Sequence, residues 1–181
     1  SITAVAADKT GGISGTLDPK FLKRADVLVY VDNVPGIHPT KDADIDQIKL
    51  TFIPRVLPIV VGSTVTFRNS DDVNHNVNSP DNEGYDLGTH PKGKGAKYAF
   101  KKPGVYTQLC NVHPEMAAFV VVLQNPYWAL VKKDGDGSFK IEGVPPGKYT
   151  AVTWHEKLKP ARAEVVVEAG KTAAVEVEPK K

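Results

Sequence analysis

Short β-forming runs separated by turn residues are the feature that most limits what this chain can fold into. Fourteen prolines and fifteen glycines punctuate the 181 residues, and the runs between them are rich in Val, Ile, Thr, Tyr and Phe. We find no amphipathic helix of ten or more residues. The sequence therefore predicts an all-β protein, and its length suits two small domains better than one large one.

The predicted strands form two groups on either side of Pro126. The first group covers residues 13–17, 27–32, 48–53, 57–61, 64–69, 97–100, 105–109 and 117–123. The second group covers residues 128–132, 138–141, 149–155, 163–167 and 173–177. Turn residues fill the gaps, and two long loops are expected at residues 33–46 and 79–94.

Soft metal ligands gather in one loop of the first group. The only cysteine and the only methionine, Cys110 and Met116, flank His113, and His75 supplies a second imidazole upstream. A thiolate, two imidazoles and a weak thioether form the donor set of blue-copper electron-transfer sites. A lone cysteine excludes both an intramolecular disulfide and a dinuclear copper centre bridged by two thiolates. The sequence therefore predicts a site for one copper ion.

The segment from residue 47 to residue 123 resembles the cupredoxin family. The resemblance rests on the order of the four candidate ligands and on the motifs that precede them. The ligand loop has the short spacing of amicyanins, including the proline after the histidine. The motifs are Phe52-Ile53-Pro54, residues 60–69, His75-Asn76-Val77, Phe100, Pro103-Gly104-Val105-Tyr106 and Cys110-x2-His113-x2-Met116.

This resemblance implies a Greek-key cupredoxin sandwich over residues 45–123 with a mononuclear type 1 copper site. His75, Cys110 and His113 would be the strong ligands, and Met116 would be the weak axial one. Asn76 is expected to tie the two ligand loops together, with a backbone N–H directed at the cysteine sulfur. The copper ion would cycle between Cu(I) and Cu(II), carrying single electrons from a redox protein donor to an acceptor, such as a cytochrome or a dehydrogenase.

The resemblance also implies that His113 is the ligand whose edge reaches the surface, and therefore the port for electrons. Pro114 and Ala117 would contribute to an apolar rim where a partner docks. Glu115 departs from the family pattern. It is interpreted either as a residue that affects docking with a charged partner or as a solvated side chain.

The remaining residues are predicted to form a second small β-sandwich. Residues 134–178 resemble the carboxypeptidase regulatory-like or transthyretin-like domain, whose opening strands match the first two predicted strands. The cupredoxin is therefore expected to be inserted, so that residues 10–35 and 125–179 form one discontinuous domain. In the alternative, the N-terminal strands belong to the cupredoxin sheet and pair with residues 64–69. The whole arrangement resembles bacterial methylamine utilisation proteins.

Charge and hydropathy give no indication of a nucleic-acid or membrane partner. The net charge is +2 with both signs interspersed, which does not suggest a nucleic-acid or membrane-surface partner. No apolar run approaches the ~20 residues of a membrane span. The segment Ser1–Ala7 has the small residues typical of the end of a signal peptide, so a periplasmic or exported location is expected.

Other polar residues are interpreted mainly as structural. His38 and His90 precede prolines and are expected in exposed turns, and His155 is expected to be a structural histidine rather than a ligand. A basic stretch is interpreted either as a solvated strand face or as a patch that steers an acidic redox partner. Its members are Lys92, Lys94, Lys97, Lys101 and Lys102.

Several functions remain open from the sequence. The same ligands would serve a periplasmic copper-trafficking protein. An enzyme or sensor with an open copper position would use Glu115, which is the only carboxylate of the ligand loop. A metal-free adhesion or carbohydrate-binding pair of sandwiches is a third reading. Hydrolase motifs are absent, and so is the His-Cys-His motif of multicopper oxidases, because Leu109 and Asn111 flank Cys110; we therefore expect an electron carrier and not an enzyme.

Overall fold

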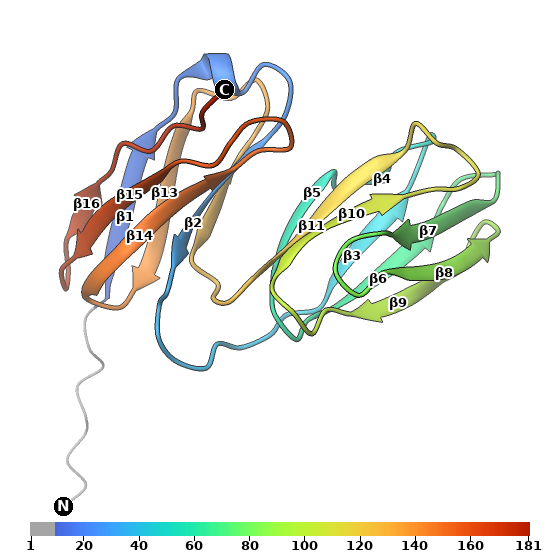
Figure 1. Cartoon of the computed structure of the whole chain (residues 1–181), viewed down its shortest axis with the longest axis horizontal. Helices are drawn as coiled ribbons and strands as arrows, with labels where there is room; N and C mark the ends of the chain where they lie inside the picture. The colour runs from blue at the N-terminus through green and yellow to red at the C-terminus, as the bar shows by residue number, and fades with distance from the viewer. Residues whose placement is uncertain (1–9) are drawn as a thin grey trace, which may run out of the picture. The chain divides into compact units, whose positions relative to one another are not determined.

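The computed structural model describes residues 10–181, and β-strands account for nearly all of its regular structure. The chain divides into two compact units, an inner unit of Ile37–Pro126 and an outer unit that contains the chain on both sides of it. In Figure 1 the inner strands run from cyan to yellow, whereas the outer unit combines blue strands with orange and red ones. No helix in residues 10–181 is both long and apolar enough to cross a membrane. The segment Ser1–Ala7, on which the predicted export rests, lies outside the described residues.

The inner unit is a sandwich of two sheets. One sheet has the strand order β5-β11-β10-β7-β8, and the other has the order β4-β3-β6-β9. The first sheet consists of β5 (Val56–Val60), β11 (Ala117–Leu123), β10 (Gly104–Leu109), β7 (His75–Ser79) and β8 (Tyr85–His90). The second consists of β4 (Phe52–Ile53), β3 (Ala43–Gln47), β6 (Thr64–Asn69) and β9 (Gly95–Ala99).

Aromatic side chains fill the space between these two sheets. Phe52, Phe67, Phe100 and Tyr106 are all almost completely buried. The rings of Phe100 and Tyr106 meet edge to face, with centroids 4.9 Å apart, a geometry that the ring quadrupoles favour. Cys110 belongs to the same core cluster, so the metal donors lie against packed apolar side chains.

The outer unit is a second sandwich with its own core. One sheet has the order β13-β1-β16 and the other the order β12-β2-β14-β15. The strands of the first are β13 (Ser138–Val144), β1 (Gly11–Thr16) and β16 (Thr172–Ala174). The strands of the second are β12 (Trp128–Val131), β2 (Val27–Asp32), β14 (Gly147–Trp154) and β15 (Arg162–Val167). A short 3₁₀ helix, η1 (Pro19–Phe21), lies between β1 and β2.

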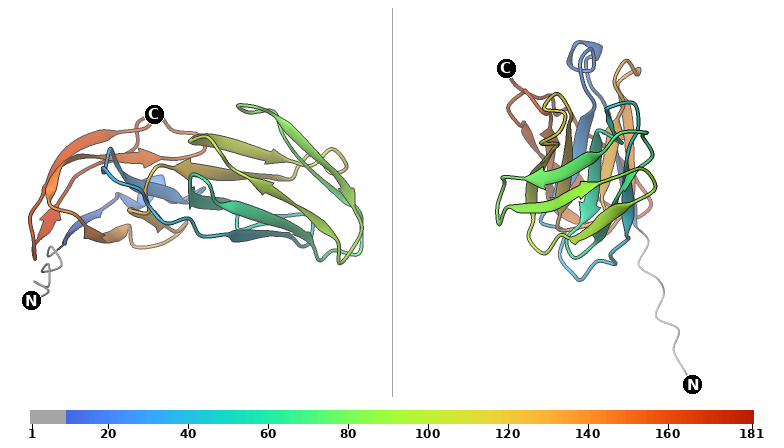
Figure 2. Two further views of the ribbon diagram at one scale, coloured as in Figure 1. Left: turned by 90° about the horizontal axis from the view of Figure 1, so that it is seen from below. Right: turned by 90° about the vertical axis from the view of Figure 1, so that its right-hand side faces the viewer.

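The two N-terminal strands pair with strands that follow the inner unit. β1 lies between β13 and β16, and β2 lies between β12 and β14. Both views of Figure 2 show these blue strands among the orange and red ones. Strand β6, which the alternative arrangement would place beside the N-terminal strands, pairs with β3 and β9. The chain therefore leaves the outer unit after β2 and returns to it at β12.

Several parts of the predicted strand map are wrong, and β7 is missing from it altogether. The strand expected at residues 48–53 is mostly a turn, because Lys49 and Leu50 adopt left-handed backbone conformations with φ values of 52° and 57°. The loop expected at residues 33–46 contains β3, and the loop expected at residues 79–94 contains β8. Both strands carry few apolar residues, so their local pattern resembles that of a loop.

Candidate metal centre

His75 is held at the start of β7 by a contact on each side of its ring. Its side chain is completely buried. Nε2 lies 2.8 Å from Oδ2 of Asp71, and Nδ1 faces the other candidate ligands. Because the carboxylate of Asp71 occupies Nε2, Nδ1 is the ring nitrogen that remains for a metal.

Cys110 follows β10 and is also buried, with 2% of its surface exposed. Its sulfur lies 3.9 Å from Nδ1 of His75 and accepts a hydrogen bond from the backbone N–H of Asn76 at 3.4 Å. This contact joins two segments 34 residues apart in the chain. A donor to the sulfur stabilises the thiolate, which is the form of cysteine that binds metals.

His113 completes the group from the loop between β10 and β11. Its Nδ1 lies 3.1 Å from Nδ1 of His75. The loop is closed by a hydrogen bond from the backbone N–H of Met116 to the carbonyl oxygen of His113 at 3.0 Å. Pro114 lies within this turn, where its fixed φ limits the conformations of the loop. Met116 is buried in the same core cluster as Cys110, immediately before β11.

The donors of this group fit a single copper ion. One ligand atom from each of His75, Cys110 and His113 lies within 4.8 Å of the others, and no other group of three such residues occurs in residues 10–181. Two nitrogens held ~2.0 Å from one ion at a tetrahedral angle would be about 3.3 Å apart, close to the 3.1 Å between Nδ1 of His75 and Nδ1 of His113. Two imidazoles, a thiolate and a nearby thioether suit both oxidation states of copper.

Asn76 connects both ligand segments through its side chain as well as its backbone. Its Oδ1 accepts the backbone N–H of Asn111 at 3.3 Å, and its Nδ2 donates to Oδ1 of Asp86 at 2.7 Å. Nδ2 of Asn78 also donates to Oδ1 of Asn76 at 2.7 Å and to the carbonyl oxygen of Leu109 at 3.2 Å. The expected tie between the two loops is present, and it extends to β8.

Two carboxylates that sequence reasoning missed support this network. Burial by itself raises the pKa of Asp71, but hydrogen bonds from two turn amides and from the His75 ring outweigh it and hold the pKa below its ordinary value. The Gly88 amide and the Asn76 side chain lower the pKa of Asp86. The position of Asp71, four residues before His75, was the only signal in the sequence.

The surface around His113 combines a partly exposed ring with apolar neighbours. The His113 side chain is half-buried, Pro114 and Glu115 are exposed, and Ala117 is half-buried. Val112, between Cys110 and His113, is 45% exposed. Val73, in the loop that leads to His75, is 45% exposed as well. Each of the two ligand segments therefore exposes one valine.

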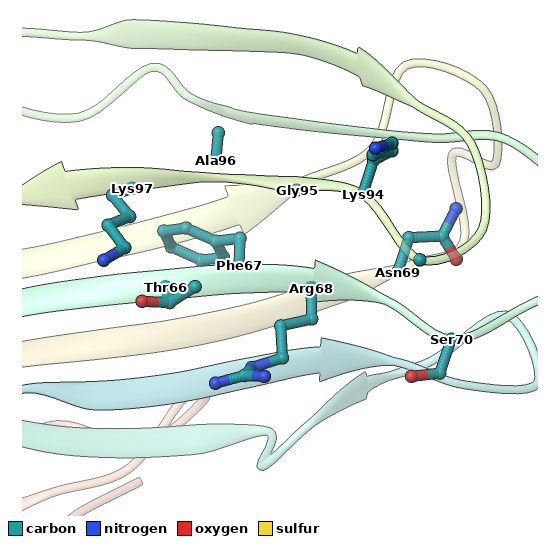
Figure 3. A pocket seen from close by; sticks show the side chains of 10 residues that line it. Thr66, Phe67, Arg68, Asn69, Ser70, Lys94, Gly95, Ala96 and Lys97 are labelled. Atoms are coloured by element: carbon teal, nitrogen blue, oxygen red, sulfur yellow. The ribbon is translucent and has the colours of Figure 1, made fainter.

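The predicted basic stretch does not form one continuous patch of free cations. Lys92 pairs with Asp72 at 2.6 Å and Lys102 pairs with Glu83 at 2.7 Å. Lys94 and Lys97 line a groove of about 420 Å³ along β6 and β9, beside Arg68 (Figure 3). None of the candidate metal donors lines this groove. Steering of an acidic partner by these lysines stays a prediction.

The remaining histidines have structural partners. The expectation of an exposed turn for His90 is wrong, because this residue ends β8 and its Nε2 contacts the carbonyl oxygen of Leu87 at 2.8 Å. His155 is buried, and its Nδ1 accepts the backbone N–H of Lys157 at 3.0 Å. Burial lowers the pKa of His155, in line with the expected structural role. His38 is half-buried near the start of the inner unit.

Two family models match parts of the chain. Residues 39–123 match the family of copper binding proteins described as plastocyanin/azurin. Residues 102–175 match domain II of polysaccharide lyase family 4, a range that begins in the inner unit and continues into the outer one. No curated protein matches the chain closely enough to count as a relative. The carboxypeptidase regulatory-like assignment and the methylamine utilisation label therefore stay predictions.

Several solved structures are similar to about half of the chain. A purple cupredoxin from Nitrosopumilus maritimus is 29% identical over 44% of this chain and 98% of its own, with a TM-score of 0.42. A copper-containing nitrite reductase from Thermus scotoductus is 27% identical over 50% of this chain and 24% of its own, with a TM-score of 0.43. A reduced amicyanin variant is 23% identical over 52% of this chain and 97% of its own, with a TM-score of 0.42. The predicted all-β architecture with a cupredoxin fold is confirmed by the family match and the strand layout.

Proposed function

We propose that this protein is a type 1 copper electron carrier, with the cupredoxin fold of its inner unit and the fit of one copper ion as premises. His75, Cys110 and His113 would hold the ion, and Met116 would be its weak axial ligand. Bound copper supplies one-electron chemistry between Cu(I) and Cu(II). The chain itself fixes the donors, excludes solvent and offers one exposed edge.

The uneven exposure of the candidate ligands is the observation that carries this proposal. His75 and Cys110 are buried, whereas His113 is only half-buried. Buried donors surrounded by packed side chains and hydrogen bonds change position little, so little reorganisation accompanies a change of charge. The exposed edge of His113 then provides a short route for an electron to a partner.

Exposed apolar side chains occur in the segments that carry or support the candidate ligands. Leu50, in the turn that Asp71 binds, is 41% exposed, in addition to Val73 and Val112. Val112 lies directly before His113 in the chain, so at least one exposed apolar side chain belongs to the loop that presents the exposed ring. We infer that redox proteins dock here, both as electron donor and as electron acceptor.

Burial of the cysteine disfavours the alternative function of copper trafficking. A protein that delivers copper must let an acceptor thiolate reach the ion and displace its ligands. Cys110 exposes only 2% of its surface and its sulfur accepts a backbone hydrogen bond. These contacts favour retention of the metal over transfer.

Copper titration of the purified full chain tests the proposed function. We expect one copper ion per chain, an intense visible absorption from thiolate-to-copper charge transfer, and reversible one-electron reduction. Cys110→Ser should abolish the visible band, because it removes the thiolate. A colourless Cu(I) protein that passes its metal to an acceptor would support trafficking instead, and failure to bind copper would contradict both functions.

We also propose that the outer unit is one discontinuous domain that serves docking or assembly. The pairing of β1 and β2 with strands that follow Pro126 supports the discontinuous arrangement. The candidate metal donors all come from the inner unit. The described residues of the outer unit contain no such group of metal ligands. We therefore assign binding of a partner, and not electron transfer, to this unit.

A further inference from the structure

The carboxylate of Asp71 contacts both the candidate ligand His75 and a turn from a different part of the chain. Oδ2 lies 2.8 Å from Nε2 of His75 and also accepts the backbone N–H of Leu50 at 2.8 Å. Oδ1 accepts the backbone N–H of Lys49. The backbone N–H of Asp71 itself donates to Oδ1 of Asn69 at 2.9 Å. Four hydrogen bonds therefore fix the position of this residue.

These contacts determine which nitrogen of His75 carries a proton. A carboxylate that already accepts two backbone N–H groups is an acceptor, so the ring nitrogen facing it must be the donor. Neutral His75 is therefore protonated at Nε2 and presents the lone pair of Nδ1. That lone pair faces Cys110 and His113, at distances of 3.9 Å and 3.1 Å from their donor atoms. Without this contact, the two tautomers of the ring would compete.

The charge of the same carboxylate lies close to the proposed copper ion. His75 is completely buried and the Asp71 side chain is only 14% exposed, so water screens this charge weakly. A negative charge in such a position favours the more positively charged state of a neighbouring metal. The carboxylate would not itself bind the copper ion. It contacts Nε2 of His75, whereas Nδ1 of the same ring faces the other donors.

We propose that Asp71 is a positioning residue that fixes His75 as an Nδ1 ligand and favours the oxidised state of the bound copper. The proposal rests on the proposed copper function. Asp71 lies outside the expected donor set and has two separable effects on the site. The hydrogen bond sets the tautomer of His75, and the negative charge lowers the reduction potential.

Two substitutions of Asp71 separate these effects. Asp71→Asn removes the charge but keeps an oxygen that can accept the Nε2–H of His75, whereas Asp71→Ala removes both. We expect both variants to favour Cu(I) over Cu(II) about tenfold more than the unmodified protein, a rise of ~59 mV for one electron. Asp71→Ala should in addition bind copper about 10- to 100-fold more weakly, as for other residues that orient metal-binding histidines.

Asp72→Asn is the matched control. Asp72 is the next residue and carries the same charge, but its side chain is 89% exposed and pairs with Lys92. The control should leave the potential within a few millivolts of that of the unmodified protein, because solvent screens an exposed charge. Equal shifts in Asp71→Asn and Asp72→Asn would overturn the proposal, as would an unchanged potential in Asp71→Asn.

A readout that needs no copper distinguishes failure of this proposal from failure of the proposed function. Nitrogen-15 NMR of the metal-free chain reports which ring nitrogen of His75 is protonated. We expect protonation at Nε2 in the unmodified protein and in Asp71→Asn, and a mixture of tautomers in Asp71→Ala. Protonation at Nδ1 in the unmodified protein would overturn the proposal, even if copper binds. Thermal unfolding of each variant shows whether the turn at Lys49 and Leu50 has kept its fold.

Discussion

Single side chains decide which atoms of the metal centre face one another. Asp71 occupies Nε2 of His75, and the backbone N–H of Asn76 occupies one side of the Cys110 sulfur. The lone pair of Nδ1 of His75 and the free lone pairs of the Cys110 sulfur then face the same small space, where the copper ion would bind. Donors fixed in this way before a metal binds lose little conformational freedom on binding, which favours affinity.

Met116 offers a test of a single weak ligand. Met116→Leu conserves volume and apolar character, so the free energy of unfolding should change by less than about 1.5 kcal/mol. If the thioether is the axial ligand, its loss should destabilise Cu(II) more than Cu(I), because Cu(I) tolerates low coordination. We expect the reduction potential to rise by roughly 60 mV, a tenfold change in relative affinity, together with a shift of the visible spectrum. Identical spectra and potentials would exclude Met116 from the coordination sphere.

Strand pairing holds the loops of the metal centre in register. β7 provides His75, and β10 and β11 lead into and out of the loop that carries Cys110 and His113. β7 pairs with β10 where Asn78 lies opposite Leu109, directly before the cysteine. A register shift of one residue would turn every side chain of the strand to the opposite face. The donor geometry therefore depends on the sheet as much as on the loops.

Gly95 tests the packing of the opposite sheet, where β9 lies beside β6. A Cβ atom at this position would collide with the backbone oxygen of Phe67. We expect Gly95→Ala to lower the free energy of unfolding by about 1–3 kcal/mol, because the strand must move away from its neighbour. Urea unfolding of the metal-free protein measures this change.

Ala96→Ser is the control for Gly95→Ala. Ala96 is the next residue of β9 and its side chain is half-buried. Such a small polar change should alter stability by no more than about 0.5 kcal/mol. Equal stability of the two variants would show that β9 can shift without cost.

Each of the two structural units has a hydrophobic core of its own. The core of the inner unit contains the aromatic cluster together with Cys110 and Met116, whereas the core of the outer unit contains mainly aliphatic side chains from β1, β2 and β13 to β15. At the junction, β2 and β12 are antiparallel neighbours, with Tyr30 opposite Trp128. The residues of the inner unit therefore lie, along the chain, between two strands that pair with each other.

Deletion of residues 37–126 tests whether the outer unit is a domain in its own right. Joining Gly36 to Tyr127 leaves residues 33–36 and Tyr127 between β2 and β12, a length that hairpin loops commonly have. We expect this shortened chain to have a β-sheet circular dichroism spectrum, to unfold cooperatively in urea and to bind no copper. A chain without a cooperative transition would show that the outer unit depends on the inner one.

The β class, most of the strands and the residue types of the candidate metal centre can all be predicted from the amino-acid sequence. Cys110, His113 and Met116 lie within one short loop, and their spacing alone brings them close together. Strands such as β2, β6 and β11 occur at the predicted residues, because their apolar runs are strong and turn residues bound them.

Contacts between segments that are distant in the chain could not be predicted in this way, because they depend on how the strands pair. β3 and β8 have weak local patterns and form because neighbouring strands offer them hydrogen bonds. Asp71 reaches His75 while it binds the turn at Lys49 and Leu50, and Asn76 reaches the Cys110 sulfur across the sheet. Local spacing fixes the residues of one loop, but sheet register and turn conformation set contacts between loops, and neither is encoded in a short stretch of sequence.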